Sequence, residues 1–382
     1  MATGKYATST SSQKRFASGA TPTGGQSENE DLANFISMIT RAETPFMSSI
    51  GKTKATGIYH EWQTDELNDP ADSTLKQGAD FDHVAPDGTD TADGGTTIAN
   101  RFRTRLGNYT QINGKTVSVS GTKRAVDQTG VADEYAYQLK KRGTELRRDV
   151  ERDLIHSINV STAGTQSGAG KMGGWTSWVN NAGHIVTKGT FYAPSSGTSP
   201  GTDGAGTHAI GIDGATATKA ALELTDVDQA MQNVYEAGGK ANRAMMSPKN
   251  RRVFSSKAQA QTQYGNVRRN IDDSGALRAS VDIYMSDFGD VTIEPNYIMG
   301  LTNSVSMRNY DHASNVVASI DLANFMVMIY DPSWWKIATL RPLKEVDVGQ
   351  KGDSTVGMIV EECTLECSNP KGSTAIYGLS GS

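Results

Sequence analysis

The sequence predicts an α+β fold from which long polar arms extend. Helix-like and strand-like segments follow one another without the regular strand–helix alternation of a parallel sheet. Residues 131–158 have the apolar spacing of one long helix. Residues 1–30 and 57–120 are polar segments with too few apolar side chains to form a core of their own. These two segments are therefore expected to lie on other surfaces.

The composition predicts a soluble chain with many turns. Of the 382 residues, 36% are hydrophobic, 21% are charged and 40 are glycines. This length is enough for two or three domain-sized units. The net charge of -5 argues against strong non-specific binding of nucleic acid by the whole chain. No apolar run approaches about 18 residues, so we expect no membrane span, and we expect no secretion signal.

The chain begins with a polar arm, residues 1–30, which is expected to be disordered or draped over another surface. Residues 29–38 then have the spacing of a short amphipathic helix. Pro45 is expected to end this helix, because proline blocks helix continuation.

Residues 57–120 predict a long hairpin-like excursion with oppositely charged halves. From Glu61 to Asp93 the sequence has ten Asp or Glu and one Lys, and from Arg101 to Val126 it has six Lys or Arg and no acid. Opposite charges on facing strands stabilise their pairing, and between two copies they set the register.

Residues 131–158 are expected to form the longest helix, about 42 Å in length. Its other faces carry six Lys or Arg and four Asp or Glu within residues 140–153. Such a helix is stable only when its narrow apolar stripe packs on a sheet or on another helix. The stripe consists of Tyr135, Leu139, Leu146, Val150, Leu154 and Ile158.

The next segment, residues 161–215, contains thirteen glycines and is expected to be loop. A helix is predicted over residues 222–237, with Thr225 as its N-cap and Gly238 as its stop. A short buried strand follows, and then a helix with Pro248 in its first turn.

The remaining segments predict mostly antiparallel strands. Residues 280–299 predict a hairpin that turns at Phe288–Asp290. Residues 323–348 and 354–370 are also expected to be strands.

No group of residues predicts a catalytic, metal or cofactor site. Residues 168–173 match G-x-G-x-x-G, but a dinucleotide-binding loop follows a strand, and here a long helix comes first. We attribute this match to chance in a glycine-rich segment. Cys363 and Cys367 are expected to be small buried residues, roughly 13 Å apart on one strand and too distant for a disulfide. The six histidines are not spaced as metal ligands.

Several basic and aromatic residues could contact a nucleic acid, but structural roles are favoured. The basic run Arg101–Arg105 could touch phosphates, yet pairing with acids of the same hairpin or of a neighbour is preferred. Aromatic residues at strand and helix spacings more often belong to a core or an interface than to a stacking platform. The aromatic residues considered are Tyr59, Trp62, Trp175, Trp178, Trp334 and Trp335.

Two stretches near the N-terminus carry a resemblance to a known family. Residues 44–51 read TPFMSSIG, and residues 59–67 read YHEWQTDEL. With these stretches the chain resembles the major capsid (major head) proteins of tailed bacteriophages that have the Hong Kong 97 type fold. Further matching stretches follow in the family's order at residues 236–256, 281–296, 330–345 and 360–372.

The resemblance implies that the chain has five parts. It implies an N-terminal arm over residues 1–50 and an extended loop over residues 51–125, which drapes over the adjacent subunit. It also implies a peripheral domain with a spine helix and a glycine-rich loop over residues 126–217. An axial domain over residues 218–330 and the return strands of the peripheral domain, with the C-terminus, over residues 331–382 complete the chain.

The resemblance further implies a structural major capsid protein that is not an enzyme and needs no cofactor. Such a protein self-assembles as hexamers and pentamers into the icosahedral head around double-stranded phage DNA. It is assembled in the cytoplasm of the host bacterium and is located in the virion shell. Scaffold, portal and decoration proteins are candidate partners, with weak non-specific contact to packaged DNA and no contact with a membrane.

The residues themselves leave one alternative open. A monomeric module could bind a carbohydrate or a nucleotide with the glycine-rich segment 161–215 as its binding loop.

Overall fold

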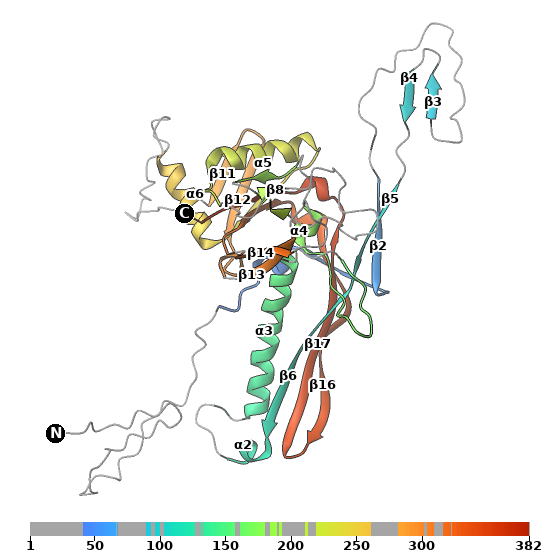
Figure 1. Cartoon of the computed structure of the whole chain (residues 1–382), viewed down its shortest axis with the longest axis vertical. Helices are drawn as coiled ribbons and strands as arrows, with labels where there is room; N and C mark the ends of the chain where they lie inside the picture. Colours follow the sequence, from blue (N-terminus) through green and yellow to red (C-terminus); the bar gives the residue numbers. More distant parts are fainter. Residues whose placement is uncertain are drawn as a thin grey trace, which may run out of the picture.

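A computed structural model gives the fold (Figure 1). It describes residues 41–65, 67, 89–92, 96–99, 103–126, 131, 133–156, 161–179, 184–188, 191–192, 211–212, 219–260, 282–301, 304–308, 316–321 and 323–381. The predicted arm over residues 1–30 and the predicted helix over residues 29–38 lie outside the described residues.

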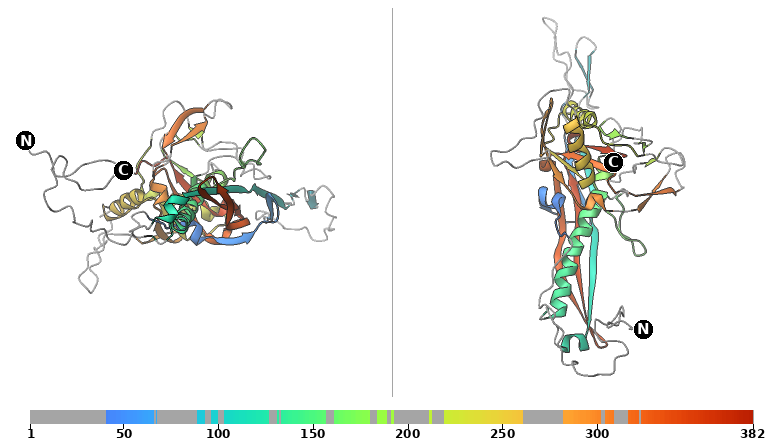
Figure 2. Two further views of the ribbon diagram at one scale, coloured as in Figure 1. Left: turned by 90° about the horizontal axis from the view of Figure 1, so that it is seen from below. Right: turned by 90° about the vertical axis from the view of Figure 1, so that its left-hand side faces the viewer.

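A four-stranded sheet and one long helix form an elongated tongue (Figure 1). Its elements are β1 Gly51–Lys54, β16 Trp335–Lys351, β17 Ser354–Cys367, β6 Gln111–Ser120 and α3 Glu134–His156. The strand order is β1-β16-β17-β6, with β1 parallel to β16 and the other neighbours antiparallel. In the right-hand view of Figure 2, α3 lies along the long strands. Helix α3 confirms the long helix predicted from the sequence.

The apolar stripe of α3 is buried mainly in its second half. Leu146, Val150 and Leu154 are buried, whereas Tyr135 and Leu139 are only half-buried. The first turns of α3 lie beside the narrow end of the tongue, and the last turns enter the core of the molecule (Figure 1). The predicted stripe residue Ile158 lies outside the described residues.

A six-stranded sheet forms the centre of the second lobe. Its order is β11-β12-β10-β15-β18-β7. The strands are β11 Ile283–Ser286, β12 Gly289–Pro295, β10 Arg243–Met246, β15 Met326–Tyr330, β18 Thr374–Tyr377 and β7 Val186–Thr187. Helices α5 Leu224–Glu236 and α6 Pro248–Ala260 cover one face of this sheet. Strand β10 and helix α6 confirm two further predictions.

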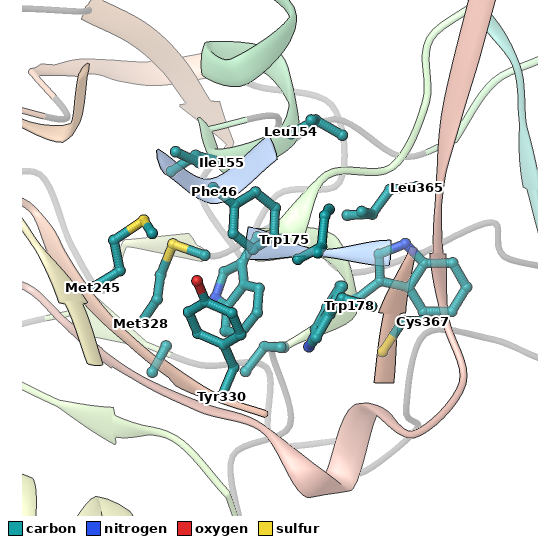
Figure 3. Close-up of a cluster of buried hydrophobic side chains, with 14 of the residues drawn as sticks. Phe46, Leu154, Ile155, Trp175, Trp178, Met245, Met328, Tyr330, Leu365 and Cys367 are labelled. Atoms are coloured by element: carbon teal, nitrogen blue, oxygen red, sulfur yellow. The ribbon is translucent and has the colours of Figure 1, made fainter. Parts of the chain in front are cut away.

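The opposite face of the six-stranded sheet packs on the main core (Figure 3). Trp175 stacks on Trp335 with ring centroids 4.4 Å apart, and Phe46 meets Tyr330 edge-on at 5.5 Å. These rings come from three separate regions of the chain, near residues 46, 175 and 330–335. Aromatic burial of this kind stabilises the junction between the tongue and the second lobe. It also confirms that Trp175, Trp178 and Trp335 are core residues.

A hairpin leaves the junction on the side opposite the tongue (Figure 1). Its strands β2 Tyr59–Thr64 and β5 Thr104–Tyr109 pair antiparallel, which confirms a hairpin in this segment. The prediction that the excursion continues to residue 120 is wrong. Strand β6 instead pairs with β17, because Val117 and Val119 are buried under α3 rather than exposed.

Smaller elements complete the described chain. The short strand pairs are β3 Thr89–Ala92 with β4 Thr96–Ala99, β8 Phe191–Tyr192 with β9 Gly211–Ile212, and β13 Ser304–Arg308 with β14 Val316–Asp321. The short helices are α1 Pro45–Ser49, α2 Gly121–Ala125, α4 Trp175–Trp178, η2 Ile298–Gly300, η3 Pro332–Trp334 and η4 Pro370–Gly372. No described helix is both long enough and apolar enough to cross a membrane.

Three local predictions need correction. Pro45 begins helix α1 rather than ending a helix, since the first helical position needs no amide donor. The N-cap of α5 is Glu223, not Thr225: the Glu223 and Asp226 side chains form a reciprocal capping box. The turn between β11 and β12 lies at residues 287–288, just before the predicted position. Gly238 does end α5, with the positive φ of 76° that glycine tolerates.

Candidate assembly surfaces

The two cysteines of the chain are buried core residues. Cys363 and Cys367 are both free and fully buried on β17, and burial raises the pKa of both thiols. They therefore remain protonated near neutral pH and confirm the expectation of small buried residues. Among the described residues, no group of three or more His, Cys, Asp or Glu could hold a metal ion.

The glycine-rich match at residues 168–173 has no dinucleotide-binding geometry. It forms the second arm of a turn in which Thr162 and Lys171 exchange backbone hydrogen bonds. The following helix, α4, has only 4 residues, and its two tryptophans are buried. Gly173 is fixed by Asn108, whose side chain accepts from its N–H at 2.9 Å and donates to its carbonyl at 3.0 Å. The backbone here positions the core.

The root of the β2–β5 hairpin is attached firmly to the core. The Trp62 ring packs on the Trp178 ring at a tilt of 43°, with ring centroids 5.3 Å apart, and its Nε1 donates to the Cys367 carbonyl at 2.9 Å. The Nε2 of His60 lies 3.1 Å from the carboxylate of Glu366, which, like Cys367, is on β17. A Cβ at residue 107 would lie 2.6 Å from the Tyr59 ring, so a larger residue there would displace that ring. The hairpin thus projects from a root that is packed on the core.

Further along the hairpin, opposite charges face each other. The Arg105 guanidinium lies 2.5 Å from the Glu61 carboxylate, and Arg103 lies 3.5 Å from Asp65. These described arginines therefore pair with acids of their own hairpin, as the sequence favours, while Arg101 lies outside the described residues. Exposed pairs of this kind contribute at most about 1 kcal/mol each, so they set register more than stability.

A buried carboxylate holds helix α1 against the spine of the tongue. Glu151 on α3 accepts hydrogen bonds from the N–H groups of Phe46 and Met47, at 2.8 and 2.7 Å, and from Asn296 Nδ2 at 2.9 Å. Burial raises the pKa of Glu151, while these three hydrogen bonds act in the opposite direction. Glu151 therefore fixes the position of α1, the helix that follows the N-terminal segment. Sequence reasoning missed this role, since Glu151 was counted only among the charges of the helix.

Among the described residues, exposed apolar side chains occur on strands of both sheets. On the tongue, Ile112 is 61% exposed and Val348 is 59% exposed, and Val346 is also exposed. At the edge strand β11, Ile283 is 57% exposed and Met285 is 76% exposed. Ile283 and Met285 are two residues apart and lie on the same side of β11, and neighbouring exposed apolar side chains are typical of protein contact sites.

Comparison with known proteins gives consistent matches. The family model described as SU10 major capsid protein matches residues 8–380. The major capsid protein of Escherichia phage Phieco32 is 33% identical over 127 residues, and this match spans 32% of this chain and 32% of the relative.

Solved capsid structures have a similar fold over nearly the whole chain. The capsid of the native GTA particle is 12% identical, with a TM-score of 0.53, and covers 94% of this chain and 97% of its own. The capsid of cyanophage P-SCSP1u, 12% identical with a TM-score of 0.50, covers 91% and 92%. The capsid of Myoviridae phage XM1, also 12% identical with a TM-score of 0.50, covers 92% and 97%. At these identities the likeness concerns the fold.

Proposed function

This chain belongs to the SU10 major capsid protein family, and on that premise we propose that its copies assemble as hexamers and pentamers into an icosahedral head around double-stranded phage DNA. The resemblance to tailed-phage major capsid proteins is thereby confirmed, as is the Hong Kong 97 type α+β fold. The protein is a structural component of the virion shell and not an enzyme.

One observation in particular supports assembly into closed rings. The tongue and the β2–β5 hairpin project in opposite directions from the junction (Figure 1). The root of the hairpin is held to the core by Trp62 and His60, and the tongue exposes the apolar side chains of Ile112, Val346 and Val348. Surfaces of this shape are covered when each copy lies against its neighbours.

The five expected parts of the chain keep their boundaries in this proposal. Residues 1–50 serve as the N-terminal arm and residues 51–125 as the extended loop. Residues 126–217, with α3 as spine helix, and the return strands over 331–382 form the peripheral domain. Residues 218–330 form the axial domain. The hairpin β2–β5 and the tongue support this division, although β1 and β6, which the boundary assigns to the extended loop, pair within the tongue.

Contact with other virion components is also proposed. Scaffold, portal and decoration proteins are candidate partners, and assembly takes place in the host cytoplasm. Contact with packaged DNA is weak and non-specific, because the chain has a net charge of -5. The unassembled chain is therefore expected to leave a heparin column below physiological salt. Retention at physiological salt would contradict weak contact.

The ligand-binding alternative is not favoured. Residues 172–179, within the glycine-rich segment, are buried in the main core rather than free to form a binding loop. A thermal-shift screen with nucleotides and sugars tests this alternative. Saturable stabilisation by one ligand class would revive it.

The assembly proposal is tested with the purified chain, expressed with and without its phage's own scaffold. Negative-stain electron microscopy and light scattering are expected to show rings or polyhedral shells of megadalton mass. A chain that stays monomeric under both conditions would contradict the proposal.

A shortened variant sharpens this test. Thr64 pairs directly with Thr104, so residues 66–102 can be replaced by a two-residue Asn-Gly turn that closes the hairpin between Asp65 and Arg103. This variant is expected to keep the circular dichroism spectrum of the body and to lose shell formation. Normal shells from the variant would show that residues 66–102 are not needed for assembly.

A further inference from the structure

Helix α3 sorts its charges onto separate faces. Its apolar residues face the sheet, whereas Glu145, Asp149 and Asp153 recur at a spacing of four residues and therefore lie on one adjoining face. Lys140 and Arg147 are seven residues apart and share a different face. Lys141 and Arg148, also seven apart, lie beside them. We call these four basic residues the cationic face; they span about 12 Å along the helix axis.

The acids of α3 are already engaged by protein groups. Lys115 on β6 lies 2.7 Å from Asp149 and 3.5 Å from Glu145. Asp153 accepts from Gln111, also on β6, at 2.8 Å, and pairs with Arg152. Arg142 forms a pair with Glu145 at 2.7 Å. These contacts turn the acidic face toward the sheet.

The cationic face has no comparable partner among the described residues. Lys140, Lys141 and Arg147 are exposed, and none lies within 4.0 Å of a described carboxylate. Arg148 is half-buried and lies over the Tyr297 ring, 6.0 Å from its centroid. One described carboxyl whose pKa responds to this face is that of Glu361. Burial raises the pKa of Glu361, and the charges of Arg147 and Lys52 act to lower it.

Glu361 does not neutralise the cationic face, because its carboxylate is buried beneath that face. Its side chain is buried on β17, and one of its oxygens has no hydrogen-bond partner. In Figures 1 and 2, no described strand runs along the side of α3 that faces away from the sheet, and the described helix α2 meets α3 only at the tip of the tongue. Three exposed positive charges, with the half-buried Arg148 beside them, are therefore available on this face for an external anion.

We propose that the cationic face of α3 contacts the phosphates of packaged double-stranded DNA. This inference rests on the proposed function. Duplex DNA carries one negative charge per roughly 1.7 Å of its axis, so it presents enough phosphates to engage all four side chains at once. Lysine and arginine donate charge-assisted hydrogen bonds to phosphate oxygens without requiring a base sequence. This side of α3 then faces the interior of the shell.

The contact is weak for one copy and adds up over a shell. Each neutralised phosphate contributes a slope of about 0.9 to the dependence of log affinity on log salt, so four contacts give a slope near −3.6. Such binding is lost readily as salt rises. This weakness agrees with the negative charge of the whole chain.

The test replaces three exposed members of the face and leaves half-buried Arg148 in place. The variant K140Q/K141Q/R147Q is compared with K240Q/K249Q/R252Q, which removes the same charge from exposed residues near α5 and on α6. Binding of a fluorescent duplex of about 30 base pairs to the unassembled chain is followed by anisotropy over a range of salt.

The α3 variant is expected to lower the salt slope by about 2.7, and the control variant is expected to leave it unchanged. Equal slopes for the two variants, or no duplex binding by the parent chain even at low salt, would overturn the proposal.

Electron microscopy of the same preparations tests the DNA contact and the shell assembly separately. Loss of shells in the α3 variant with unchanged DNA binding would assign the face to a protein partner. Failure of the parent chain to form shells would instead count against the proposed function.

Discussion

At the scale of single residues, Glu151 connects three segments that are far apart in the sequence. It lies on α3 and binds the backbone of α1 and the side chain of Asn296. A charged carboxylate that is buried must have such partners, because desolvation otherwise costs several kcal/mol. Glu151 therefore determines where the N-terminal segment meets the body.

Replacing Glu151 by alanine is expected to lower the free energy of unfolding by roughly 3 kcal/mol, because two buried donors and one half-buried donor lose their acceptor. Urea unfolding of the unassembled chain measures this change. The control is E236A at the exposed end of α5, with an expected change below about 0.5 kcal/mol. Equal changes in the two variants would refute the anchoring role of Glu151.

His156, at the end of α3, makes stability depend on pH. Burial and, to a smaller extent, the nearby charge of Arg152 together lower the pKa of His156 to about 4. The unfolded chain takes up this proton near pH 6.5, about 2.5 units above the folded chain. Folding is therefore weakened as pH falls from about 6.5 toward 4.

The variant H156L is expected to lack this component. Between about pH 7 and pH 4.5, the parent chain should lose roughly 2 to 3 kcal/mol more unfolding free energy than H156L. Comparing the two chains cancels the titration of the carboxylates that they share. Parallel stability curves would show that His156 does not titrate in this way.

At the scale of elements, local patterns predicted most helices and strands. The apolar spacing of α3, the glycine that ends α5, and Pro248 at the start of α6 all act within a few residues, so the sequence shows them directly. Helix α1 was missed because its anchor, Glu151, lies 105 residues away.

Long-range pairing could not be predicted in the same way. Strand β6 appeared to continue the hairpin, but its position is set by β17, more than two hundred residues later in the chain. Trp175 and Trp178 lie in a glycine-rich segment predicted to be loop, and their burial depends on β16 and on the Trp62 ring. The pairing of Arg105 with Glu61 was predictable, since both lie in one hairpin.

The charged faces of α3 also depend on contacts between segments that are far apart in the sequence. The sequence showed ten charged residues on α3 within residues 140–153, but only the contacts of Lys115 and Gln111 reveal which of those charges are satisfied. The cationic face could not be separated from its acidic neighbour without the position of β6.

The arm and the hairpin are expected to be accessible before assembly. Limited proteolysis of the unassembled chain should cut within residues 1–30 and 60–100, and these sites should become protected in shells, because neighbouring copies then cover them. Mass spectrometry of the fragments locates the cuts. Resistance of both segments in a proven monomer would contradict the draped-arm interpretation.

At the scale of the whole molecule, the protein is elongated, with its principal core at one junction (Figures 1 and 3). Two sheets, α1, α3 and α4 meet there. From this junction the tongue and the hairpin extend beyond the body of the chain. A subunit of this shape can contact several neighbours at once, which suits a closed shell of many copies.

The most direct test of this account is a cryo-electron microscopy reconstruction of the assembled particle at side-chain resolution. We expect rings of six and five copies in which the β2–β5 hairpin of one subunit lies on an adjacent subunit. A particle in which the hairpin contacts only its own chain, or an assembly without closed rings, would contradict the proposed function.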